Sequence, residues 1–152
     1  MNLKVRRVVT GHDDSGKAVV KIDDLGSHVV QGRKNLYRQL IWTTEELPVE
    51  FSDTDEDLGA RDIATTVSGG SVFRIIEYQP GVAPRNHRTD SIDYAVVISG
   101  EIDMELDDTV VHLKRGDVLV QRGTIHNWVN NGTESCVIAF VLISAHGDTA
   151  VG

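Results

Sequence analysis

Two short stretches of this 152-residue chain carry side chains that could do chemistry together. In the first stretch, His87, Thr89 and Asp93 share one parity. Because side chains alternate across an extended strand, all three would then point to the same face. In the second stretch, His126 and Trp128 share a parity just after a glycine turn. Two imidazoles and a carboxylate on neighbouring strands could converge inside a barrel, where they could hold a transition metal or transfer protons.

The elements that must position these side chains are short β-strands. Val and Ile together number 32 against 18 for Leu and Ala, and branched side chains fit pleated sheets better than helices. Gly, Pro, Asn and Asp turn signals separate the β-rich runs, which is typical of a sandwich or a closed barrel. We therefore expect an all-β chain with strands over residues 3–10, 17–22, 36–43, 71–79, 92–99, 102–106, 110–113, 118–121 and 137–143.

The N-terminal part carries two further expectations. Turn-forming residues between residues 3–10 and 17–22 predict a β-hairpin. The acidic run over residues 45–57 lacks the spacing of a calcium-binding loop, so we expect a solvated loop rather than a cation site. No segment of the sequence predicts a helix.

Composition excludes several classes of protein. The chain holds 15 Lys and Arg against 23 Asp and Glu, and its net charge of −8 disfavours binding to nucleic-acid backbones. A lone cysteine, Cys136, cannot form an internal disulfide or a cysteine-based metal site. No run approaches the roughly 20 apolar residues of a membrane helix, and the start does not read as a signal peptide. A cytoplasmic protein without membrane or nucleic-acid partners is expected.

The spacing of glycines and polar residues resembles the two sequence motifs of the cupin family. The matching positions are Gly81-x5-His87-x-Thr89-x3-Asp93-x6-Gly100 and Gly116-x6-Gly123-x2-His126-x3-Asn130. The resemblance implies a jelly-roll barrel, the double-stranded β-helix of cupins, with extra N-terminal strands and a small-molecule pocket inside. It also implies a homodimer. We expect a single domain in which residues 70–146 form the barrel and residues 1–69 pack on it or are swapped across it.

The resemblance further implies a metal site. Carried over by position, the ligands are His87, Asp93 and His126, holding Fe, Mn, Ni, Zn or Cu. Thr89 stands where the family has its second histidine, and Asp93 stands where the family has glutamate. The expected pocket residues are Thr89, Gln121, Trp128 and Arg85.

Three functions remain open at this point. The first is a metal-dependent enzyme that oxygenates, isomerises or decarboxylates an aromatic, polyketide-like or oxo-acid compound. The second is a metal-free isomerase or dehydratase in which His87 or His126 acts as general base and Asp93 orients it. The third is a module that binds a small molecule without turnover.

Overall fold

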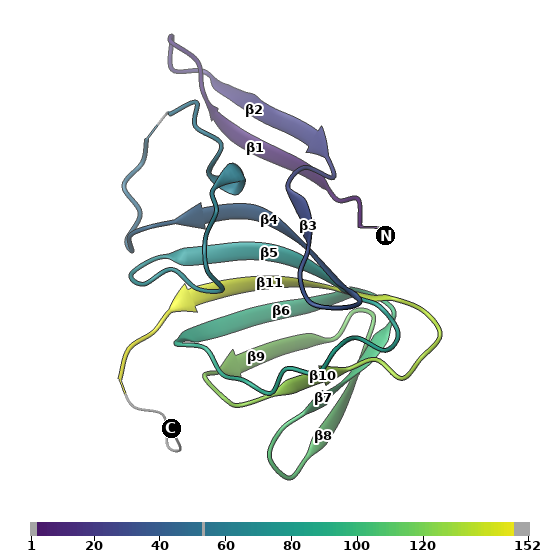
Figure 1. Cartoon of the computed structure of the whole chain (residues 1–152). Helices are drawn as coiled ribbons and strands as arrows, with labels where there is room; N and C mark the ends of the chain where they lie inside the picture. The colour runs from purple at the N-terminus through teal and green to yellow at the C-terminus, as the bar shows by residue number, and fades with distance from the viewer. Residues whose placement is uncertain (1–2, 53, 148–152) are drawn as a thin grey trace.

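The computed structural model describes residues 3–52 and 54–147, and its regular structure consists almost wholly of β-strands (Figure 1). A short 3-10 helix, η1 (Leu58–Ala60), lies between β4 and β5. The strands are β1 (Arg6–His12), β2 (Ala18–Leu25), β3 (Val29–Gln31), β4 (Leu36–Thr44), β5 (Ser71–Tyr78), β6 (Ser91–Ser99), β7 (Glu101–Glu105), β8 (Val110–Lys114), β9 (Val118–Arg122), β10 (Asn127–Val129) and β11 (Cys136–Ser144).

The strands form three sheets. The largest has the order β3-β4-β5-β11-β6-β9, a smaller one has the order β10-β7-β8, and β1 pairs with β2 as a separate hairpin (Figure 1). The last strand, β11, lies between β5 and β6 and pairs antiparallel with both. The two segments predicted to carry chemistry come together through the pairing of β6 with β9 and an isolated bridge between His87 and His126.

Alternation along the strands builds one core between the two larger sheets. In β11 the buried positions are Cys136, Ile138, Phe140 and Leu142, every second residue. They pack against residues of the smaller sheet such as Trp128, which is 3 % exposed. The inward face of the six-stranded sheet therefore forms both the core and the floor of any pocket inside the barrel.

A buried arginine attaches the β1–β2 hairpin to the barrel. Arg7 is 3 % exposed and donates to both Asp24 and Asp57 and to the carbonyl of Ile41. Because Ile41 lies in β4, these bonds connect the hairpin, the acidic segment and the main sheet. A second small apolar cluster around Leu3, with Ile41 and Ile75, packs beneath the chain start.

The all-β prediction and the N-terminal hairpin are confirmed, while three details of the prediction were wrong. Two short strands, β3 and β10, were missed because three residues give too little alternation to detect. The acidic run is not wholly a solvated loop, since Asp57 accepts from Arg7 and also caps η1 through the amide of Gly59. Within the part of the chain that is described, no helix is long and apolar enough to cross a membrane.

Candidate active site

Two histidines face each other at one end of the barrel. His87 lies in the loop between β5 and β6, and His126 immediately precedes β10. The two residues form an isolated antiparallel bridge, and the centroids of their rings lie 4.5 Å apart. The predicted convergence of the two sequence stretches is therefore observed for the histidines.

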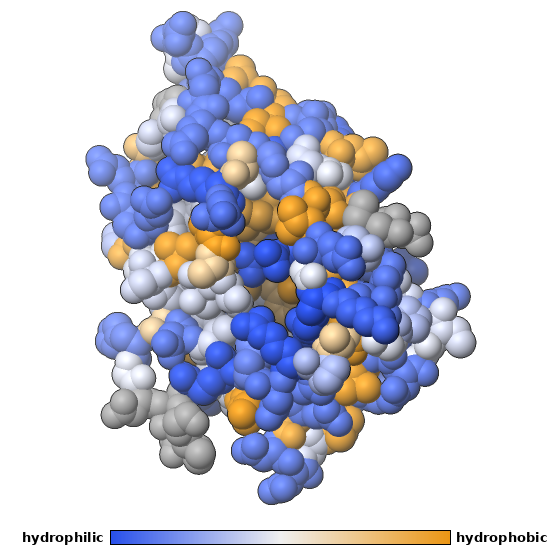
Figure 2. All heavy atoms as spheres, in the orientation of Figure 1, coloured by the Kyte–Doolittle hydropathy of each residue, from blue (hydrophilic) through white to orange (hydrophobic). Residues whose placement is uncertain are grey.

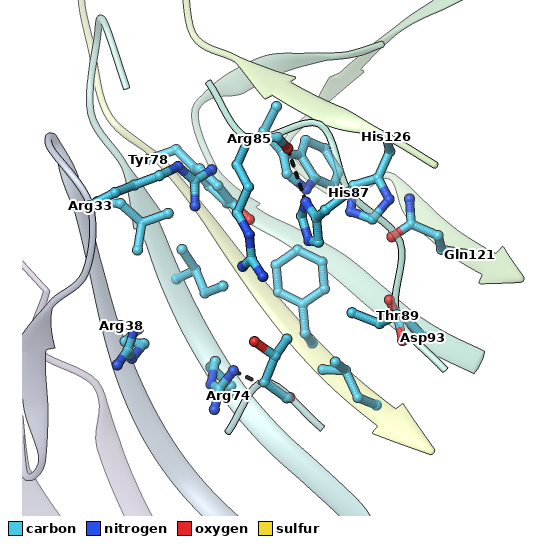
Figure 3. A pocket seen from close by; sticks show the side chains of 16 residues that line it. Arg33, Arg38, Arg74, Tyr78, Arg85, His87, Thr89, Asp93, Gln121 and His126 are labelled. Atoms are coloured by element: carbon cyan, nitrogen blue, oxygen red, sulfur yellow. Dashed lines mark hydrogen bonds between the residues drawn. The ribbon is translucent and has the colours of Figure 1, made fainter. Parts of the chain in front are cut away.

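Backbone carbonyls fix the tautomer of both imidazoles. Nδ1 of His87 lies 2.9 Å from the carbonyl oxygen of Arg85, and Nδ1 of His126 lies 2.8 Å from that of Thr124 (Figure 3). A carbonyl oxygen can only accept, so Nδ1 carries the proton and Nε2 keeps a free lone pair. This is the arrangement in which a histidine is ready to bind a metal ion or accept a proton.

Burial keeps both imidazoles neutral. Burial is the main cause that lowers the pKa of His126 to about 4; nearby positive charge acts in the same direction, and the bond to the Thr124 carbonyl partly offsets both. Burial also lowers the pKa of His87; the bond to the Arg85 carbonyl partly offsets this, whereas the charge of the Arg85 guanidinium adds to it. Near neutral pH the pair is therefore uncharged.

Asp93 and Gln121 are register partners on β6 and β9 and line the pocket near the histidines. Asp93 is 4 % exposed and accepts from the hydroxyl of Ser91, whose oxygen lies 2.8 Å from Oγ1 of Thr89. Burial raises the pKa of Asp93, partly offset by the Ser91 bond. The predicted inward face of this strand is correct, and it carries a carboxyl group that holds its proton more tightly than usual.

Gln121 has an unused acceptor. Its amide nitrogen lies 3.3 Å from the sulfur of Met104, whereas its buried Oε1 has no hydrogen-bond partner. An unsatisfied buried carbonyl oxygen is costly and calls for a partner that the protein itself does not provide. Figure 3 shows Gln121 on the same side of the pocket as His87 and His126.

The pocket between these groups has an apolar wall and an opening to solvent. Its cavity volume is about 90 Å³. Trp128 packs edge-on against His126 and Phe140, so it is both core and pocket wall. In the space-filling view the molecule is hollowed near its centre and hydrophilic residues surround the hollow (Figure 2).

All seven residues singled out from the sequence line this pocket, but sequence reasoning missed three arginines that also line it. The missed residues are Arg33, Arg38 and Arg74. Arg74 could have been found, because it interrupts the apolar run of β5 at the parity of the buried Val72 and Tyr78. The predicted residues are Arg85, His87, Thr89, Asp93, Gln121, His126 and Trp128.

The donor set fits a metal ion in part. The Nε2 atoms of His87 and His126 suit two ligand positions, and the free Oε1 of Gln121 suits a third. In residues 3–52 and 54–147 no three His, Cys, Asp or Glu side chains are grouped closely enough to hold an ion. Asp93 is thus not gathered with the histidines into the predicted set, and one of its oxygens is engaged by Ser91. Its role as a ligand stays a prediction.

Comparisons with known proteins place these observations in context. Residues 74–143 match the family model described as "Cupin domain". The cupin-domain-containing oxidoreductase fogC of Aspergillus ruber is 38% identical over 150 residues, covering 94% of this chain and 74% of that protein. Phomopsin biosynthesis cluster protein C' of Diaporthe leptostromiformis is 41% identical over 133 residues, covering 82% of this chain and 69% of that protein.

A solved structure is similar in fold. An RmlC-like cupin from Shewanella frigidimarina has a TM-score of 0.56 at 14% identity, covering 81% of this chain and 88% of that one. At this identity the likeness shows the fold alone. It confirms the predicted jelly-roll barrel.

Proposed function

Because the chain belongs to the cupin family, we propose that it is a small-molecule oxidoreductase whose reaction takes place beside His87 and His126. The observation that carries the proposal is the pair of neutral imidazoles, each held by a backbone carbonyl and each with a free Nε2. Relatives named as cupin-domain-containing oxidoreductases support this class of reaction. A relative named for phomopsin biosynthesis supports a small-molecule substrate.

We propose that a divalent transition metal is held by His87 and His126, with an oxygen of Gln121 or Asp93 as a further donor. A metal bound there supplies Lewis acidity toward a carbonyl or enolate oxygen of the substrate. The chain's own contribution is to keep both imidazoles neutral, with the proton on Nδ1 and Nε2 free, and to keep apolar side chains around the substrate.

A metal-free acid–base enzyme is the second candidate, and one observation favours it. Burial moves the pKa of His126 down and the pKa of Asp93 up within the same pocket. A neutral base and a carboxyl group whose proton is held more tightly than usual, both facing one substrate, are a pairing suited to isomerases and dehydratases.

Elemental analysis of protein purified without chelator tests the metal. We expect near-stoichiometric Fe, Mn, Ni, Zn or Cu in the wild type, and loss of that metal in His87→Ala and in His126→Ala. The control is His146→Ala, an exposed histidine outside the pocket. If the wild type takes up none of these metals on reconstitution, the metal site is wrong.

The class of reaction is tested by mass spectrometry in D2O with a panel of aromatic and oxo-acid compounds. An oxidoreductase changes the mass of its substrate by two hydrogens or by added oxygen, whereas a dehydratase removes one water. An isomerase leaves the composition unchanged and exchanges a carbon-bound hydrogen for deuterium. Exchange without a change in composition, or loss of one water, would replace the proposed function by the acid–base alternative.

A further inference from the structure

Four arginines line the candidate pocket, and Figure 3 shows Arg85 next to His87, with Arg74 and Arg38 farther from the histidines. Arg38 lies on β4 and Arg74 on β5, while Arg33 and Arg85 come from the loops that follow β3 and β5. Arg74 is 7 % exposed, whereas Arg38 and Arg85 are exposed toward solvent. The cluster thus runs from the mouth of the pocket to its floor.

These arginines have no acidic partner among the residues that the structure describes. The bonds that they make go to neutral carbonyls: Arg33 donates to Ala83 at 2.6 Å, and Arg74 donates to Ala64 and Thr65 at 3.3 and 3.4 Å. Nε of Arg74 is buried without any partner. A buried guanidinium whose donors are unmatched destabilises the folded protein unless an anion compensates for it.

The absence of partners in the pocket is not explained by a lack of acids in the chain. The protein carries 23 Asp and Glu, and arginines elsewhere in the chain form ion pairs with some of them. Arg6 pairs with Asp23, and Arg88 pairs with Asp90. The pocket arginines instead act on one another: after burial itself, Arg38 lowers the pKa of Arg74, which falls to about 10.

Asp93 does not serve as the missing partner. It is the one acid among the described residues that line the pocket, but β11 separates it from Arg74. Arg74 is opposite Phe140, and Asp93 is opposite Leu142, so two apolar side chains of β11 lie between the positions of the charges. Asp93 also accepts from Ser91 and is held in an environment that favours its neutral form.

We propose that this arginine cluster, Arg33, Arg38, Arg74 and Arg85, binds the carboxylate of a small organic acid. The apolar body of that acid would lie against Trp128 and Phe140. This inference deepens the proposed function, because it names the class of substrate that would lie between the arginines and the histidine pair. A guanidinium offers a planar fork of donors that matches the planar carboxylate. The apolar wall and the cavity volume of about 90 Å³ suit a compact acid rather than a nucleotide. The exposed arginines at the mouth attract such an anion from solution.

Calorimetry of the purified protein with benzoate tests the proposal, with benzamide as the neutral isostere and inorganic phosphate as the alternative anion. We expect benzoate to bind and benzamide and phosphate to bind at least about tenfold more weakly. We expect Arg74→Met and Arg85→Met each to weaken the binding of benzoate by about tenfold or more. Arg122→Met, which removes an exposed arginine outside this pocket, should have no effect.

A second measurement separates ligand binding from a structural role. Arg74→Met should raise the thermal midpoint of the ligand-free protein, because it removes an uncompensated buried charge. A lowered midpoint, equal binding of benzamide and benzoate, or unchanged benzoate binding in both arginine variants would overturn the proposal. Preference for phosphate would overturn the assignment to a carboxylate. Benzoate binding does not depend on turnover, so it can succeed even where the oxidoreductase assay fails.

Discussion

His87 and His126 hold each other in place through the backbone. The amide of His87 donates to the carbonyl of His126 at 3.0 Å, and the amide of His126 donates to the carbonyl of His87 at 2.9 Å. The spacing of the two imidazoles is therefore set by main-chain atoms that survive a change of side chain. Substitution of either imidazole removes chemistry while leaving this bridge available, which makes the pair suitable for functional tests.

The unsatisfied oxygen of Gln121 gives the first prediction. Gln121→Leu removes a buried carbonyl without a partner, so the metal-free protein should lose no thermal stability and can gain some. If Oε1 binds the metal, the same change should weaken metal affinity by about tenfold. A thermal scan and a metal titration measure the two effects.

Gln39 provides the matched control. Its buried Oε1 also lacks a partner, but Gln39 lies outside the pocket. Gln39→Leu should therefore resemble Gln121→Leu in stability and the wild type in metal affinity. Equal metal affinity in both variants would count against Gln121 as a donor.

The ion pairs of Arg7 give a prediction with a pH dependence. Arg7 lowers the pKa of Asp57 below the value of an unfolded chain, where an Asp carboxyl titrates at about 4. The unfolded chain then binds more protons than the folded one as the pH falls through that value. The stability from the pair is therefore fully present above about pH 4 and is lost as the pH drops toward the folded pKa.

Asp57→Asn should lower the free energy of unfolding by about 2 kcal/mol at neutral pH, because Arg7 is buried and loses a charged acceptor. It should also flatten the loss of stability below about pH 4. Urea unfolding across this range measures both. Asp23→Asn, which breaks the exposed pair with Arg6, should remain close to the wild type, and a similar loss in both variants would contradict the argument.

The outer face of β6 and β9 leads us to expect a homodimer. Tyr94 and Val96 pair with Val120 and Val118, and all four side chains are exposed on the edge of the six-stranded sheet. A second copy of the chain would cover this strip and the edge strand. Light scattering should give a dimer for the wild type and a monomer for Val118→Glu. The control is Val110→Glu, an exposed position on β8 of the three-stranded sheet, which should leave the dimer intact. A monomeric wild type would refute the expectation.

How far the site could be predicted depended on whether its residues lie close together in the sequence or are brought together only by the fold. His87, Asp93 and His126 were accessible because glycine spacing and strand parity are local features of the sequence. The grouping of the four pocket arginines was not, although the inward parity of Arg74 was visible, because Arg74 and Asp93 come to face one cavity only after β11 inserts between β5 and β6. The ion pair between Arg7 and Asp57 was missed for the same reason, since the two residues lie 50 positions apart along the chain.

Gly100 gives the last prediction, because the turn that it forms connects the strand of Asp93 to the smaller sheet. Its φ is 74°, and a Cβ there would lie 2.2 Å from the carbonyl oxygen of Ser135 and 2.9 Å from Cα of Cys136. Neither backbone atom can move without shifting the start of β11. We therefore expect Gly100→Ala to lower the free energy of unfolding, measured by urea titration, by about 3 kcal/mol or more. The left-handed backbone strain and the overlap with backbone atoms both contribute.

Gly116 separates these two causes. Its φ is 89°, but nothing lies within 4 Å of the added Cβ, so Gly116→Ala carries the strain without the overlap. It should cost about 1 kcal/mol in the same urea titration. Because β11 also bears Phe140 and Leu142 on the pocket floor, Gly100→Ala should weaken binding in the pocket as well, whereas Gly116→Ala should not. Equal losses of stability in the two variants would show that close approach to Ser135 does not explain the glycine at position 100.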